Sequence, residues 1–192
     1  MFRKAEILSR IELRQSTIKD WLSCPLMFRY RHVLQLAPSY RSLAAIHGSA
    51  LHLCIHRLHR GGFDLDLGLL YARALEEVLE SESHIPIRWK KGVEEDRLIM
   101  LTHAAEILKG YVNHEQNHTS TLMYSEVKFR VRVNGMLLTG TIDQVRHNMD
   151  STLELIDLKS GMQRPMKRAL QRDWQLNLYA YALRYGEIFI HG

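Results

Sequence analysis

Apolar residues in the first half of the chain recur at the spacing of three and four that is typical of amphipathic helices. Ser16 offers an N-cap for the first predicted helix, and Pro25 either interrupts that helix or begins a second turn. Gly61 and Gly62 are expected to close the second helix, and a loop is expected around Pro86. Four helices are predicted in this half, over residues 16–28, 42–60, 67–80 and 93–117.

The period changes to two at residues 127–133, where apolar and charged side chains alternate as in a half-buried strand. Asn134-Gly135 favours the positive backbone angles of a tight hairpin, so the next strand should return antiparallel. The remaining predicted elements are strands over 136–146, 152–158 and 187–191 and a helix over 169–185. We therefore expect one α/β domain over 1–192, with a mostly helical part over 1–120 and a sheet part over 121–192. Its central mixed sheet should have helices on both faces.

Composition adds two limits to this picture. A chain of 192 residues with 46% hydrophobic residues can fill a single core, and its formal charge of +5 is a weak indication of a polyanionic partner. No segment approaches the roughly 18 apolar residues of a membrane span, and the start lacks the apolar core of a secretory signal. We expect a cytoplasmic protein with no membrane partner. Cys24 and Cys54 alone can form neither a disulfide framework nor a four-thiolate metal site.

Candidate chemistry lies at the ends of two neighbouring predicted strands. Strand alternation places Asp157 and Lys159 on one face, and Asp143, at the end of the preceding strand, could converge on them. Two carboxylates brought together repel each other unless a cation or proton intervenes, and hard oxygen ligands favour Mg²⁺ or Mn²⁺. An exposed aspartate with a strand-end salt bridge is the alternative interpretation.

Phosphodiester hydrolysis would use these residues in distinct roles. A metal lowers the pKa of the attacking water and neutralises charge that develops on the phosphate. Lys159 would orient that water and stabilise the transition state, and the backbone carbonyl of Leu158 would complete the metal shell.

Five motifs occur in a fixed order along the chain: STIKDWLSCP at 16–25, Gly48 to His52, GTID at 140–143, DLKSG at 157–161 and QLNLY at 175–179. Together they resemble the PD-(D/E)xK nuclease superfamily over roughly residues 16–190. The pattern is most similar to the RecB-like branch, which includes the nuclease domains of RecB and AddB and the CRISPR adaptation nucleases. This resemblance implies a restriction-endonuclease-like core and a DNA nuclease, with exonuclease activity in recombination, repair or processing.

Residue by residue, the resemblance implies that His52, Asp143 and Asp157 bind Mg²⁺ or Mn²⁺ and that Lys159 is catalytic. Glu126 stands where related sequences often carry an acid on the preceding strand, so an accessory role is expected. Its alternating basic neighbours fit an ordinary solvated strand face equally well.

Contacts to DNA are expected from two groups. Gln175 and Tyr179 are four residues apart, so they share one helix face and would position DNA or the scissile phosphate. A core tyrosine with a surface glutamine is the alternative. Four cations would bind backbone phosphates without reading the base sequence, unless they form only a solvated helix end: Arg164, Lys167, Arg168 and Arg172.

Other functions stay open from the sequence. A catalytically silent nuclease-like module would bind DNA or a helicase partner. A zinc hydrolase could use the histidines at 52, 56 and 59, although no H-E-x-x-H pair is present. Many relatives hold an iron–sulfur cluster through a cysteine placed like Cys24 and three later ones. This chain lacks that trio, so we expect no cluster, and Cys24 is a remnant, a buried thiol or half of a site completed elsewhere.

Overall fold

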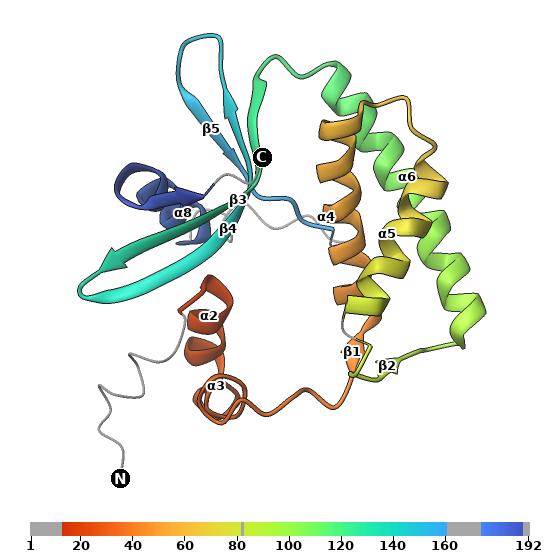
Figure 1. The fold of residues 1–192 in the computed structure, drawn as a ribbon, viewed down its shortest axis with the longest axis horizontal. Helices are drawn as coiled ribbons and strands as arrows, with labels where there is room; N and C mark the ends of the chain where they lie inside the picture. The colour runs from red at the N-terminus through yellow and green to blue at the C-terminus, as the bar shows by residue number, and fades with distance from the viewer. Residues whose placement is uncertain (1–12, 82, 161–173, 190–192) are drawn as a thin grey trace.

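The computed structural model describes residues 13–81, 83–160 and 174–189, which form a helical half and a sheet half (Figure 1). The helical segments are α2 (Gln15–Ser23), α3 (Pro25–Phe28), the π-helical turn η1 (Arg29–Val33), α4 (Leu43–Gly61), α5 (Leu67–Ser81), α6 (Val93–Gln116) and α8 (Trp174–Tyr185). The strands are β1 (Arg41–Ser42), β2 (Ile87–Arg88), β3 (Thr121–Val133), β4 (Met136–His147), β5 (Leu153–Ile156) and β6 (Glu187–Phe189). Each predicted helix and each predicted strand has a counterpart.

Helix α4 begins and ends where the sequence predicts. The Ser42 hydroxyl accepts a hydrogen bond from Ala45 N over 3.2 Å, and Gly62 follows the last turn with a φ of 93°. The prediction for the first helix was wrong in its N-cap, because α2 already begins at Gln15. The preceding backbone is fixed by Thr139 N, which donates to Leu13 O over 2.9 Å, so the helix starts immediately after this contact.

The main sheet has the order β5-β4-β3-β6. Its three pairings are antiparallel, so the mixed sheet that we expected is not found among the described strands, where parallel pairing is confined to β1 and β2. Short turns connect β3, β4 and β5, and a parallel neighbour would need a long crossover. The predicted hairpin is confirmed, with positive φ at Asn134 and Gly135.

Apolar side chains form two clusters rather than one core. The first is built by α4, α5 and α6, around the fully buried Ile46, Tyr71 and Leu108. The second lies between the sheet and α8, where Phe129 contacts Tyr179 edge to face with ring centroids 5.8 Å apart. Figure 1 shows α8 and α4 on opposite sides of the β3–β4 ribbon. The expected α/β arrangement, a sheet with helices on both sides, is therefore present.

A buried polar network joins the helical half to the sheet half. The Arg146 side chain, 3% exposed, donates to both carboxylate oxygens of Glu115 over 3.0 and 2.9 Å. Its remaining N–H groups donate to the hydroxyl and carbonyl of Ser120 and to Gln144 Oε1. Gln144 Nε2 in turn donates to the Tyr111 hydroxyl over 2.6 Å. Because every charge has hydrogen-bonding partners, this network can remain buried and hold α6 against β4.

No helix in the described part of the chain is both long enough and apolar enough to cross a membrane.

Candidate active site and metal centre

Glu126 and Asp143 lie opposite each other on neighbouring strands. The pairs Ser125–Gln144 and Val127–Ile142 flank them in the β3–β4 register. Glu126 has a φ of 56°, a left-handed conformation that is strained for a non-glycine residue within a strand. Such strain costs roughly 1–3 kcal/mol and is concentrated at functional sites. The irregular backbone brings the Glu126 carboxylate toward α4, where His52 lies.

His52, Glu126 and Asp143 form a compact group of potential metal ligands. His52 Nδ1 is 3.5 Å from Glu126 Oε1 and 3.7 Å from Asp143 Oδ1. One ligand atom from each of the three residues lies within 4.8 Å of the other two. One imidazole nitrogen and two carboxylate oxygens suit a divalent cation such as Mn²⁺ or Mg²⁺, so the donor set fits the ion that the sequence predicts.

Buried negative charge shapes the electrostatics of this group. Burial raises the pKa of Asp143 to about 6, and the carboxylates of Asp157 and Glu126 act in the same direction, against His52 and a backbone N–H. The pKa of His52 is raised, first by its interaction with Glu126 and then by Asp143 and Asp157, against the effect of burial. The Asp157 carboxylate contributes to both shifts, but it is not one of the three described residues whose ligand atoms lie within 4.8 Å of one another. A bound cation would compensate for this excess of negative charge.

Asp157 and Lys159 form a second group with the start of α8. Lys159 Nζ lies 2.5 Å from Asp157 Oδ2, and its side chain is 56% exposed. Gln175 Nε2 donates to Asp157 Oδ1 over 2.7 Å, and Gln175 Oε1 accepts from Lys159 over 3.3 Å. Gln175 Nε2 also lies 2.5 Å from the Tyr179 hydroxyl. The predicted helix face thus points at the Asp157–Lys159 pair, and both Gln175 and Tyr179 are buried, which differs from the surface-glutamine alternative.

The two groups meet at the backbone of Leu158. Its N–H donates to Asp143 Oδ2 over 2.6 Å. Strand β5 therefore ends at Ile156 rather than at residue 158, because this N–H bonds a side chain instead of continuing the ladder. A Leu158 carbonyl ligand to the metal stays a prediction, as do the roles of the other site residues.

Two motif glycines have structural reasons that the sequence alone does not reveal. A Cβ on Gly48 would lie 3.1 Å from Ser160 Oγ, so the glycine one turn before His52 lets α4 approach the DLKSG segment. A Cβ on Gly140 would lie 2.7 Å from two ring atoms of Phe129, its cross-strand partner. Both glycines therefore permit close packing beside the acidic residues.

The histidines of α4 do not converge on one ion. His56 Nδ1 lies 3.1 Å from Ser125 Oγ, and His59 Nε2 lies 2.6 Å from the Tyr111 hydroxyl. Only His52 joins the acidic group, which disfavours a zinc site built from the histidines at 52, 56 and 59.

Cys24 is exposed at the junction of α2 and α3, so the buried-thiol interpretation was wrong. The predicted phosphate-binding cations lie outside the described residues: Arg164, Lys167, Arg168 and Arg172.

Comparison with known families decides the wider assignment. The model of the PD-(D/E)XK nuclease superfamily matches residues 12–188. The chain belongs to the PD-(D/E)XK nuclease superfamily. The α/β architecture is that of a restriction-endonuclease-like fold, and membership indicates a nuclease, that is, a phosphodiester hydrolase that binds DNA. Members of this superfamily generally use divalent metals, in keeping with the group of His52, Glu126 and Asp143. No curated protein matches the chain.

Proposed function

We propose that this PD-(D/E)XK protein is a deoxyribonuclease that depends on Mg²⁺ or Mn²⁺. The observation that carries the proposal is the meeting of His52, Glu126 and Asp143 within 4.8 Å, next to the Asp157–Lys159 pair. Asp157 is included among the proposed ligands because the next residue, Leu158, donates its N–H to Asp143, which holds the two aspartates in neighbouring segments.

The residues would divide the work of hydrolysis. A divalent cation held by these ligands would activate the attacking water and neutralise charge on the phosphate. Lys159, with an exposed ammonium beside Asp157, would orient that water and stabilise the charge of the transition state. Gln175 holds Asp157 and Lys159 in place, and Tyr179 supports Gln175 from the core. The Leu158 carbonyl would supply a further ligand.

We further propose an exonuclease of the RecB-like branch that acts in the cytoplasm in DNA recombination, repair or processing. The order of the five sequence motifs supports this assignment, and so does the Gly48–His52 pair that places α4 against the DLKSG segment. A helicase or recombination protein would be the natural partner, because such a nuclease acts on strands that another protein separates.

Cleavage assays separate this proposal from a silent nuclease-like module. Linear and circular DNA, single- and double-stranded, would be incubated with Mg²⁺, Mn²⁺, Zn²⁺ or EDTA. The expected result is cleavage of linear DNA in Mg²⁺ or Mn²⁺, loss of cleavage in EDTA, and a fall of about 100-fold or more in Asp157→Ala and Lys159→Ala. Folding of both variants would be checked by circular dichroism. DNA binding without cleavage in any metal would contradict a nuclease, and cleavage of circular DNA would contradict an exonuclease.

A further inference from the structure

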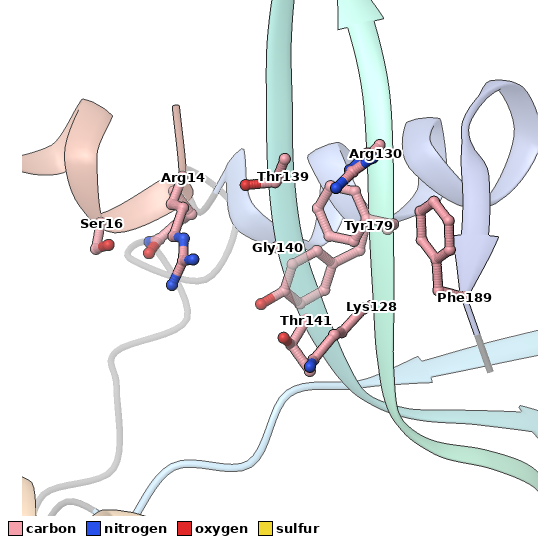
Figure 2. Close-up of a pocket in the computed structure, with 11 residues that line it drawn as sticks. Arg14, Ser16, Lys128, Arg130, Thr139, Gly140, Thr141, Tyr179 and Phe189 are labelled. Carbon is pink, nitrogen blue, oxygen red and sulfur yellow. The ribbon is translucent and has the colours of Figure 1, made fainter. Parts of the chain in front are cut away.

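A cavity of about 660 Å³, separate from the proposed metal ligands, lies over the distal half of the β3–β4 hairpin (Figure 2). Its walls come from the start of α2, from both hairpin strands, from β6 and from α8. The residues that matter for its chemistry are Arg14, Lys128, Arg130, Thr139, Tyr179 and Phe189. None of these belongs to the proposed metal ligands.

The described lining of this cavity is basic. Arg14, Lys128 and Arg130 contribute three cationic side chains, and no acidic residue is among the described residues that line it. Lys128 and Arg130 are two residues apart on β3, so they share one face and stand about 7 Å from each other along the strand. The cavity is therefore suited to an anion with more than one charged group.

Thr139 supplies an independent observation. It is 6% exposed, and its hydroxyl has no hydrogen-bond partner among the described residues. Buried hydroxyls are normally bonded, so an unpartnered one in a cavity wall is a donor that a ligand could use. A phosphate oxygen is an acceptor that could meet this need.

Two aromatic side chains, Phe189 and Tyr179, are among the lining residues (Figure 2). Phe189 is 38% exposed, and the Arg130 guanidinium lies 5.3 Å from its ring centroid. Tyr179 lines the cavity and is hydrogen bonded to Gln175, which bonds Asp157. Tyr179 thus connects the cavity to the Asp157–Lys159 pair through Gln175, and Phe189 adds an aromatic ring to the lining.

We propose that this cavity binds the backbone of single-stranded DNA beside the site of cleavage. The inference rests on the proposed nuclease function. Cations that follow the backbone together with an aromatic side chain are the usual means of binding single strands. A duplex would keep its bases stacked and paired, so Phe189 would have no base to contact.

Binding assays in EDTA test the cavity separately from catalysis. The probe is a fluorescent, unstructured single-stranded oligonucleotide, followed by anisotropy across a range of salt concentrations. We expect Lys128→Gln and Arg130→Gln each to weaken binding about 5- to 10-fold and to reduce the salt slope by about 1. The matched control is Arg132→Gln, an exposed arginine on the same strand outside the cavity, which should change affinity less than about twofold.

A Thr139→Val variant distinguishes a ligand role from a purely structural one. If the hydroxyl contacts DNA, the variant should bind the oligonucleotide about 2- to 5-fold more weakly while it unfolds at the same or higher temperature. Unchanged binding would remove Thr139 from the site. Equal losses for Arg130→Gln and Arg132→Gln, or equal losses on duplex and single-stranded DNA, would overturn the proposal.

Competition and cleavage complete the test. Displacement of the oligonucleotide by inorganic phosphate, at an ionic strength where chloride has no effect, would indicate a simple anion site and contradict the strand assignment. If the predicted binding pattern appears but no metal supports cleavage, the nuclease proposal fails alone. If the wild type cleaves DNA and the cavity variants bind normally, only the cavity assignment fails.

Discussion

The Leu158 N–H and the Asp143 carboxylate are joined by a 2.6 Å hydrogen bond, which connects the GTID and DLKSG motifs directly. This bond ends β5 and turns the chain, so that Asp157 and Lys159 leave the strand beside the end of β4. The other oxygen of Asp143 faces His52 at 3.7 Å. One carboxylate therefore both orders the backbone of the site and faces the proposed cation position.

Replacing Asp143 by Asn separates these two roles. The amide oxygen of Asn can still accept from Leu158 N, whereas the negative charge beside His52 is lost. We expect Mn²⁺ affinity, measured by calorimetric titration, to fall at least about tenfold, because even loss of an outer-shell partner costs 10- to 100-fold. Asp64→Asn, an exposed aspartate between α4 and α5, is the control and should bind Mn²⁺ like the wild type. Equal affinities for all three proteins would exclude Asp143 as a ligand.

Substitutions of Glu126 test whether its backbone strain is retained because the carboxylate binds metal. Glycine accepts a φ of 56°, so Glu126→Gly should relieve about 1–3 kcal/mol of strain and lose about 0.5–1 kcal/mol through chain entropy. Glu126→Gln removes the charge and keeps the strain. In urea unfolding, Glu126→Gly should be as stable as Glu126→Gln or more stable by up to about 2.5 kcal/mol. Both should bind Mn²⁺ more weakly than the wild type. A less stable Glu126→Gly variant would show that the backbone there is not strained.

Gly140 should tolerate no side chain while Phe129 is present. A Cβ would approach two atoms of a fully buried ring at 2.7 Å, so Gly140→Ala should destabilise the protein by about 1–3 kcal/mol. The cost should shrink in a Phe129→Leu background, and a double-mutant cycle measures that coupling. Gly110→Ala is the control, since a Cβ there meets no atom within 4 Å and alanine favours the helix. Additive effects of Gly140→Ala and Phe129→Leu would refute the ring contact.

The buried His47 should make the folded protein less stable in mild acid. Its ring is 8% exposed and lies 2.5 Å from the Tyr71 hydroxyl and 3.0 Å from His103. Burial lowers the pKa of His47 from 6.5 to about 4, with the nearby His103 acting in the same direction. The unfolded chain therefore binds a proton below pH 6.5 that the folded protein refuses until about pH 4, so stability falls across this range.

Urea unfolding at several pH values measures this effect. Between neutrality and about pH 4.5, the wild type should lose about 2–3 kcal/mol more than His47→Gln. The same pH dependence in both proteins would contradict a neutral, buried His47.

Much of the fold could be predicted because it depends on local signals. Ser42 and Gly62 mark the ends of α4, and the Asn134-Gly135 turn fixes the β3–β4 hairpin. The β1–β2 pair was missed because two-residue strands carry no periodicity, and their partners are far apart in sequence. The parallel or antiparallel direction of the strand pairs was predicted less well. Periodicity shows which face of a strand is buried, but not which other strand it pairs with.

Part of the site was also accessible from the sequence. The motifs single out Asp157, Lys159 and Gln175, and the structure brings these three side chains together. It joins Asp143 to them through the Leu158 backbone N–H, while the roles of all four residues stay predictions. The sequence predicted only an accessory role for Glu126 and not its place beside His52 and Asp143. That place depends on a positive φ within β3, which the regular alternation of the flanking residues does not reveal. The Arg146 network could not be predicted either, since it joins helices and strands that are distant along the chain.

The rate of Mg²⁺-dependent cleavage of end-labelled single-stranded DNA, compared between the wild type and Asp143→Asn, tests the central claim most directly. The wild type should show saturable dependence on Mg²⁺ and no cleavage in EDTA, and Asp143→Asn should be slower by about 100-fold or more while remaining folded. Cleavage by the wild type in EDTA, or a wild-type rate for Asp143→Asn, would contradict hydrolysis at this site.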